Sequence, residues 1–347
     1  MKAWMIYGAN GYTGELIARE AVRRGHRPIL AGRNGDRIQS LARELALEAR
    51  VFTLAEPSRT SEWLSGVDAV LHCAGPFIRT SGPMVGACLA AGVHYLDITG
   101  ELGVFEWITS MSAEASARGV TLLPGVGFDV VPTDCLAAML SARLPSADHL
   151  MLAFYAKGGE VSRGTMKTMI EGIGEGGAIR RDGRIVRVPL VHDVREIPFS
   201  CGPRMAMTIP WGDVSTAFHT TGIPNIQVYS ASSPKTIAGA RWITRLAPLL
   251  SFGPIKRLLQ KAAERRSGPD ETKRASGRTY LWGQVSDAAG RSASMTMTTP
   301  ESYAFTALSA VTAVERLLAA DRRPGSFTPA KFFGPRFVES IPGVIID

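Results

Sequence analysis

Short apolar runs alternate with amphipathic segments along residues 1–145. The apolar runs cover 3–7, 28–31, 50–53, 68–73, 93–97 and 120–124, and helical periodicity covers 14–25, 35–48, 58–65, 81–92, 103–118 and 131–143. Apolar runs that lack alternation are typical of strands buried on both faces. Strands that alternate with helices form parallel sheets through right-handed crossovers. We therefore predict an α/β fold that begins with a Rossmann-type doubly wound parallel sheet.

The regular alternation of predicted strands and helices ends after residue 145. Strands are predicted near 148–156 and at 194–199, 204–209, 225–231, 279–286 and 292–299, with a helix at 162–176 and a turn at Arg181-Asp182-Gly183. The last two strands flank Asp287-Ala288-Ala289-Gly290, which is typical of a hairpin. This pattern predicts a second, mixed α/β domain over 131–300 that serves substrate binding or oligomerisation.

A strongly amphipathic stretch at 301–319 predicts a helix with a wide apolar face. We expect this helix to return to the first domain and the Pro- and Phe-rich residues after it to form an extended surface tail. The predicted dinucleotide-binding domain is therefore 1–130 with 301–347.

Composition narrows the class. Apolar residues make up 45% and charged residues 20% of the 347 residues, which fits globular domains and excludes disordered and fibrous proteins. A net charge of +8 is one feature of proteins that bind nucleic acid. Because the arginines are scattered, we read the charge as a general arginine bias and expect no nucleic-acid partner. A small-molecule substrate is the expected partner.

Residues 237–266 form an apolar and then basic segment. A helix that makes weak peripheral contact with a membrane is one interpretation. A helical excursion with a solvated basic face, or part of a homodimer contact, is the other, and we expect a homodimer. The chain lacks an uninterrupted apolar stretch of about 18 residues, so no integral membrane segment is predicted.

The four cysteines are Cys73, Cys88, Cys135 and Cys201. None lies in a CxxC pair or beside a histidine at metal-ligand spacing, so we predict no metal site. They are typical of small buried residues in a reducing compartment. The N-terminal residues run directly into a strand without the features of a signal peptide. The expected location is cytoplasmic.

The first predicted strand runs into a glycine loop, Gly8-Ala9-Asn10-Gly11-Tyr12-Thr13-Gly14, and then into a helix. Glycines allow the tight turn and the close approach of a pyrophosphate, and a helix N-terminus offers N–H groups and a positive dipole end. Asn10, Tyr12 and Thr13 add polar contacts. The context of strand, glycines and helix predicts a dinucleotide site, whereas a glycine-rich turn without ligand is the alternative.

The second predicted strand is followed by Gly32-Arg33-Asn34, where an NAD site usually carries an Asp or Glu for the ribose hydroxyls. Arg33 can instead pair with a 2′-phosphate through its forked guanidinium. We therefore predict NADP (NADPH) as the cofactor, with Arg33 and Asn34 in its site. A solvated surface arginine is the alternative.

The fourth strand ends in a loop of small residues, Cys73-Ala74-Gly75-Pro76, at the edge where ligands bind in this class of fold. We expect this loop to contact the ribose and nicotinamide. A plain turn between strand and helix is the alternative.

Five segments together resemble the saccharopine dehydrogenase-like oxidoreductases, which include the trans-acting enoyl reductases. They are IYGANGYTG (6–14), AGRN (31–34), CAGPF (73–77), YLDITGE (95–101) and GFDVVPTD (127–134), and the resemblance continues through 211–229. It implies an N-terminal NADP-binding Rossmann domain, a central α/β domain and a C-terminal return. The family has varied substrates.

Reduction of a substrate by hydride transfer often needs a side chain that is positioned to donate or accept a proton. Tyr-x-x-x-Lys is absent, which counts against a short-chain dehydrogenase mechanism. We predict Asp97 and Asp129, which follow the fifth and sixth strands, as catalytic carboxylates whose loops face the cleft between the domains. Helix capping or turn formation is the alternative for both. His219, in a predicted loop at 211–222, is the catalytic histidine candidate because its neighbours are polar and an imidazole can transfer a proton near pH 7. A structural histidine is the alternative.

These features predict an NADPH-dependent oxidoreductase that reduces a carbonyl, imine or enoyl group of a small to medium metabolite. A non-catalytic NADP-binding protein that senses redox state is the alternative.

Overall fold

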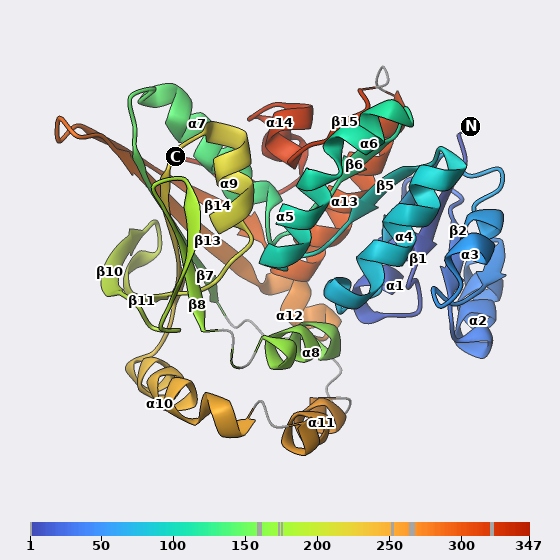
Figure 1. Cartoon of the computed structure of the whole chain (residues 1–347), viewed down its shortest axis with the longest axis horizontal. Coiled ribbons are helices and arrows are strands. Elements are labelled where there is room, and N and C mark those ends of the chain that lie inside the picture. The colour runs from blue at the N-terminus through green and yellow to red at the C-terminus, as the bar shows by residue number, and fades with distance from the viewer. Residues whose placement is uncertain are drawn as a thin grey trace. The chain divides into compact units, whose positions relative to one another are not determined.

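The computed structural model of the protein describes residues 2–157, 162–172, 174, 176–250, 253–263, 268–319 and 323–347. The chain forms two compact units. The first comprises Met1–Asp129 and Tyr303–Phe333, and the second Val130–Ser302 and Gly334–Asp347. Figure 1 shows the elements of both.

The first unit is built on a seven-stranded sheet with the order β15-β6-β5-β4-β1-β2-β3. Its strands are β1 (Trp4–Tyr7), β2 (Ile29–Gly32), β3 (Ala49–Val51), β4 (Ala69–His72), β5 (His94–Asp97), β6 (Thr121–Leu123) and β15 (Gly325–Ser326). Every neighbouring pair is parallel. The chain leaves β1 toward β2 and β3, then returns to build β4, β5 and β6 on the other side. This confirms the doubly wound sheet, with its topological switch point between β1 and β4.

Helices cover the first sheet. They are α1 (Tyr12–Arg23), α2 (Gly35–Leu45), α3 (Pro57–Trp63), α4 (Phe77–Ala91), α5 (Leu102–Ser110), α6 (Ser112–Ala117), α13 (Ser302–Ala319) and α14 (Pro329–Phe333). The predicted return of the C-terminal helix is confirmed, because α13 belongs to this unit. Ser309 of α13 donates a hydrogen bond to the carbonyl of Val126 (2.8 Å), and Arg24 at the end of α1 pairs with Glu315 (3.0 Å).

The second unit contains a nine-stranded mixed sheet, ordered β10-β11-β12-β7-β13-β14-β16, with β8 paired to β12 and β9 to β8. Its strands are β7 (His149–Lys157), β8 (Gly177–Arg181), β9 (Arg184–Val188), β10 (Val194–Phe199), β11 (Gly202–Thr208), β12 (Asn225–Ala231), β13 (Arg278–Ser286), β14 (Ser292–Pro300) and β16 (Ile345–Ile346). Its helices are α7 (Val131–Arg143), α8 (Arg163–Glu171), α9 (Asp213–Thr221), α10 (Pro234–Leu250), α11 (Gly253–Ala263) and α12 (Glu271–Ser276).

Close packing joins α7 to this sheet. Gly283 of β13 faces the helix, and a Cβ at Gly283 would lie 2.7 Å from Leu140 Cδ1 and 3.1 Å from Leu136 Cδ2. The absence of a side chain at Gly283 therefore allows α7 to lie directly on the central strands. The predicted hairpin of 279–286 and 292–299 is formed by β13 and β14.

Several elements differ from the sequence predictions. The turn at 181–183 joins two unpredicted strands, β8 and β9, and the predicted loop at 211–222 contains α9. The α9 sequence is rich in β-branched residues, so its propensity is low and its helix depends on burial of Val214 and Ala217. The predicted surface tail is largely incorporated into the fold, with Phe337 and Ile341 buried.

Residues 334–347, predicted to belong with the first domain, belong to the second unit because β16 pairs with β14. Within the part of the chain that the structure describes, no helix is long and apolar enough to cross a bilayer.

Candidate functional site

The glycine loop lies against the loop that follows β4. Gly8 adopts a positive φ of 87°, and a Cβ there would lie 2.8 Å from the Ala74 amide nitrogen. Gly14 packs directly on the Gly8 carbonyl. A side chain at Gly8 would clash with the loop after β4, and one at Gly14 would clash with the backbone of Gly8 and Ala9. Gly8 therefore allows the close approach of the two loops, and Gly14 allows α1 to start directly on the glycine loop. The glycine loop thus lies beside the switch point between β1 and β4, where ligands bind in this class of fold.

The helices α1, α2 and α4 follow β1, β2 and β4, and they differ in which groups accept hydrogen bonds from their first backbone amides. The side chain of Asn34 caps α2, accepting a hydrogen bond from the Arg37 amide (3.1 Å). The Glu101 carboxylate accepts hydrogen bonds from the Phe77 and Ile78 amides of α4 (both 2.7 Å). By contrast, no side chain among the described residues caps α1, whose N-cap is Gly11. The α1 N-terminus, at Tyr12 and Thr13, is therefore suited to an anion.

Arg33 lies just after β2, where its side chain is exposed. Among the described residues, none forms an ion pair or hydrogen bond with it. The neighbouring side chains are positioned by the fold: Asn34 caps α2, and Asn10 lies beside Gly32, where a Cβ would be 3.1 Å from Asn10 Oδ1. An exposed guanidinium that no described acid neutralises, beside the glycine loop, fits a 2′-phosphate.

The loop after β4 is held by buried polar groups. The Cys73 amide donates to the carbonyl of Tyr7 (2.7 Å), which keeps the loop beside β1. Thr80 donates to the Ala74 carbonyl (2.7 Å), and His72 Nε2 lies 3.0 Å from Thr80 Oγ1. Complete burial lowers the pKa of His72 to about 3, so its imidazole stays neutral. Burial also raises the pKa of the Cys73 thiol, which argues against a reactive thiolate.

The next residues, Gly75 and Pro76, are joined by a cis peptide bond, and Pro76 is the N-cap of α4. Glu101 binds the first amides of that helix, so the loops after β4 and β5 are joined. Neither Glu101 nor His72 is among the site residues predicted from the sequence. An acid that follows a strand by four residues carries no pattern that distinguishes this role.

Asp97 is fully buried at the end of β5 and accepts three hydrogen bonds. The donors are the Tyr95 hydroxyl (2.7 Å) and the amides of Thr99 (3.0 Å) and Gly125 (2.8 Å). Burial raises the pKa of Asp97 to about 6, and the hydrogen bonds oppose that rise. Asp97 thus joins the end of β5 to the loop after β6. These hydrogen bonds suit a residue that positions the loop leading to Asp129.

Asp129 lies in a different environment from Asp97. Its side chain is partly exposed and packs on Gly100, where a Cβ would lie 2.5 Å from Asp129 Oδ2. Within the described parts of the chain, no residue donates a hydrogen bond or a positive charge to this carboxyl group. Desolvation raises the pKa of Asp129 to about 7. A carboxyl group with this pKa is half protonated at neutral pH and can donate or accept a proton.

His219 lies in the second unit, in the last turn of α9. It is half-buried, and its ring makes an edge contact with the Phe218 ring at a centroid distance of 5.6 Å. The first unit brings together the glycine loop, Arg33 and the loops that carry Cys73–Pro76, Asp97 and Asp129. The catalytic role of His219 stays a prediction.

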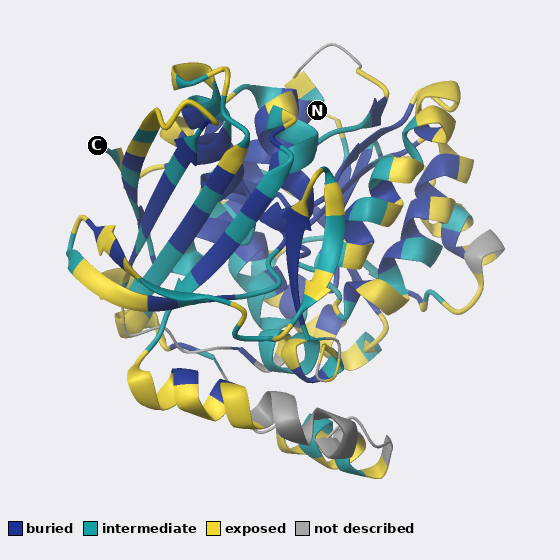
Figure 2. Cartoon of the chain, turned by 60° about the vertical axis from the view of Figure 1, so that its left-hand side comes forward, coloured by how far each residue is buried: buried dark blue, intermediate teal, exposed yellow. Residues whose placement is uncertain are grey.

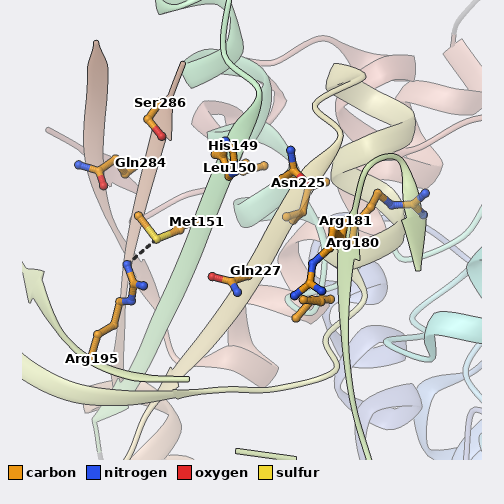
Figure 3. A pocket seen from close by; sticks show the side chains of 12 residues that line it. His149, Leu150, Met151, Arg180, Arg181, Arg195, Asn225, Gln227, Gln284 and Ser286 are labelled. Atoms are coloured by element: carbon orange, nitrogen blue, oxygen red, sulfur yellow. Dashed lines mark hydrogen bonds between the residues drawn. The ribbon is translucent and has the colours of Figure 1, made fainter. Parts of the chain in front are cut away.

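The second unit also contains a cavity of about 330 Å³ that the sequence did not predict. Figure 3 shows that its wall is formed by strands of the mixed sheet, with Arg195, Gln227 and Gln284 among its side chains. Asn225 with Gln227, and Gln284 with Ser286, lie two residues apart on β12 and β13. Polar residues at alternate positions of two strands are the signal that indicates this surface.

Comparison with known proteins identifies the first unit. Residues 4–123 match the family model of the saccharopine dehydrogenase NADP-binding domain. Over these residues the match confirms the resemblance inferred from the sequence, and it supports an NAD(P)-binding domain.

Two relatives and one solved structure extend the comparison. A Mycobacterium tuberculosis protein whose name places it with the trans-acting enoyl reductases is 32% identical over 181 residues, which is 48% of this chain and 43% of that protein. The human saccharopine dehydrogenase-like oxidoreductase is 25% identical over 231 residues, 59% of this chain and 52% of the human protein. The chain thus spans about half the length of these relatives. The structure of saccharopine dehydrogenase (L-Glu forming) from Saccharomyces cerevisiae has a TM-score of 0.66 at 10% identity, covering 100% of this chain and 99% of that one. It supports the fold.

Proposed function

We propose that the protein is an NADPH-dependent oxidoreductase, because residues 4–123 match the family model of the saccharopine dehydrogenase NADP-binding domain. It reduces a carbonyl, imine or enoyl group of a small to medium metabolite. The observation that carries this proposal is the Asp129 carboxyl group. It is desolvated, has no protein partner among the described residues and belongs to the same unit as the dinucleotide loop.

The residues of the first unit fit NADPH. The uncapped N-terminus of α1 and the side-chain-free Gly8 and Gly14 suit the pyrophosphate. Arg33 binds the 2′-phosphate, because its fork of N–H donors matches the phosphate oxygens and the end of β2 carries no acid to accept from the ribose hydroxyl instead. When bound, NADPH supplies a hydride.

Asp129 holds the proton that balances hydride transfer. Its pKa of about 7 allows it to be protonated before transfer and to remain as the carboxylate afterwards. Asp97 acts through the backbone, since its hydrogen bond with the Gly125 amide fixes the start of the loop that carries Asp129. His219 is the second-unit candidate for the same proton transfer.

An NADPH-oxidation screen over panels of carbonyl, imine and enoyl compounds tests the proposal. With a substrate in hand, Asp129→Asn should lower kcat by about 10²–10⁴-fold, the usual contribution of general acid catalysis, with little change in NADPH affinity. His219→Ala is assayed in parallel, and Asp36→Asn, which removes an exposed carboxyl from α2, is the charge control. If the protein bound NADPH but turned over no compound of the panels, this result would contradict the proposed reductase activity and would favour a redox-sensing role.

A further inference from the structure

The helices α10 and α11 carry an unusual distribution of charge. Residues 234–263 contain six Lys and Arg and no Asp or Glu. The chain as a whole has 39 Lys and Arg against 31 Asp and Glu, so this segment accounts for most of the net charge of +8. The excess is local, and it gives this part of the second unit a positive field that the scattered arginines elsewhere do not.

The described cations of this segment also have no acidic partners. Lys235, Arg241, Arg257 and Lys261 are all exposed, and within the described residues none of them forms an ion pair. On α1, by comparison, Arg19 and its neighbours are paired with glutamates of the same or the adjacent helix. Four cations that form no ion pair with a described residue are therefore available to an anionic partner.

Large apolar side chains are exposed beside these cations. Trp242 of α10 is 61% exposed and follows Arg241, and Leu258 of α11 is 68% exposed and follows Arg257. Residues 234–242 of α10 are exposed except for Ile237 and Ala240, which are buried, as the mostly yellow turns of this helix in Figure 2 show. An isolated exposed Leu is ordinary, but here each helix exposes a large apolar side chain and the arginine that precedes it in sequence.

The geometry of α11 separates its two faces. Its exposed positions 254, 257, 258, 261 and 262 follow the spacing of one helical stripe. The less exposed positions 255, 259 and 260 face inward, and Gln260 donates a hydrogen bond to Glu171 of α8 (2.7 Å). The outward stripe thus places Leu258 between Arg257 and Lys261, while the inner face holds the helix on the second unit.

We propose that Lys235, Arg241, Trp242, Arg257, Leu258 and Lys261, the α10–α11 surface, dock the protein on an anionic lipid bilayer. The cations attract lipid phosphates, and Trp242 and Leu258 enter the boundary between headgroups and acyl chains, where aromatic and aliphatic side chains gain burial. A second copy of the chain fits less well, because a two-fold contact would oppose the same cations. Nucleic acid would use the cations but not Leu258.

Flotation of the purified protein with lipid vesicles tests this surface. Vesicles of phosphatidylglycerol mixed with phosphatidylcholine should bind the protein, pure phosphatidylcholine should bind it far more weakly, and high salt should release it. A blue shift and lipid-quencher sensitivity of tryptophan fluorescence should accompany binding and disappear in Trp242→Ala.

Substitutions separate the contribution of the cations to vesicle binding from that of the apolar side chains. Arg257→Gln with Lys261→Gln should weaken binding about 25-fold, since each cation near an anionic surface contributes about fivefold. Trp242→Ala or Leu258→Ala should weaken it about tenfold. Trp107→Ala, which removes a 37% exposed Trp from α5, and Arg204→Gln, which removes an exposed cation from β11, are the matched controls and should change binding less than about twofold.

Three results would overturn the proposal. They are absence of binding to anionic vesicles, equal binding to neutral ones, and equal losses in the controls. Light scattering of the same variants tests whether a second copy of the chain binds this surface instead. If the parent protein were a dimer that did not bind vesicles, and if Arg257→Gln with Lys261→Gln dissociated it, the surface would be assigned to self-association. Circular dichroism establishes that each variant is folded.

Discussion

Replacing Asp129 with Asn should change the pH dependence of stability in a direction opposite to that of an ordinary carboxylate. An unfolded Asp titrates near pH 3.9, whereas desolvation raises the pKa of the folded Asp129 to about 7. Between these values the folded state holds one proton more than the unfolded state. Unfolding therefore releases a proton, and the free energy of unfolding falls as the pH rises.

The magnitude follows from the two pKa values. The slope is about 1.4 kcal/mol per pH unit, so the full loss between about pH 4 and pH 7 is about 4 kcal/mol. Asp129 is partly exposed, and water screens part of this penalty. We therefore expect about 2 kcal/mol. The amide of the Asp129→Asn variant carries no charge at any pH, so this variant should gain about 2 kcal/mol over the parent protein between about pH 4 and pH 8.

Urea unfolding at a series of pH values measures this difference. The comparison with the parent protein cancels Asp97, whose raised pKa contributes to both curves. Asp36→Asn is the control for loss of one exposed carboxyl, and its difference from the parent should not grow with pH in this way. A difference for Asp129→Asn that stays constant, or that shrinks as the pH rises, would refute the reasoning that Asp129 is desolvated and without a partner.

Three further substitutions test particular contacts. Gly8→Ala should weaken dinucleotide binding at least about tenfold, because a methyl group there meets the backbone of the loop after β4; Gly25→Ala, which has a similar positive φ but open space, should keep the affinity at a stability cost of about 1 kcal/mol. Gly283→Ala should lower the free energy of unfolding by about 1–3 kcal/mol in urea titrations, since its methyl group would overlap α7, and an unchanged midpoint would contradict that packing. Glu101→Gln should cost about 1–2 kcal/mol by the same assay, because two charge-assisted hydrogen bonds to the α4 amides are weakened, whereas a neutral effect would show that the cap is unimportant.

Local periodicity made the first unit predictable. Its strands are short and apolar, its helices are amphipathic, and the turns between them are short, so each element is determined by residues close to it in sequence. The second unit depends more on distant contacts. The strand β8 contains Arg180 and Arg181, and α9 contains several β-branched residues, so local preference disfavours both. Pairing with β12 and β9, and burial of α9, stabilise these elements instead.

The same distinction applies to the site. Gly8 and Arg33 directly follow β1 and β2, and Gly14 lies in the first turn of α1, so their places could be predicted from spacing alone. The difference between Asp97 and Asp129 could not, because it depends on which backbone amides reach each carboxyl group. His72 and Glu101 likewise act through Thr80 and the α4 amides, contacts that no motif encodes.

The dissociation constants of NADPH and NADH, measured for the parent protein and Arg33→Ala, test the central claim most directly. Loss of a charge-assisted contact with the 2′-phosphate should weaken NADPH about 10- to 100-fold and NADH less than about threefold. Arg43→Ala, which removes an exposed arginine from α2, should leave both dissociation constants unchanged. Equal losses of NADPH and NADH in Arg33→Ala, or a parent protein that binds NADH as tightly as NADPH, would contradict the account.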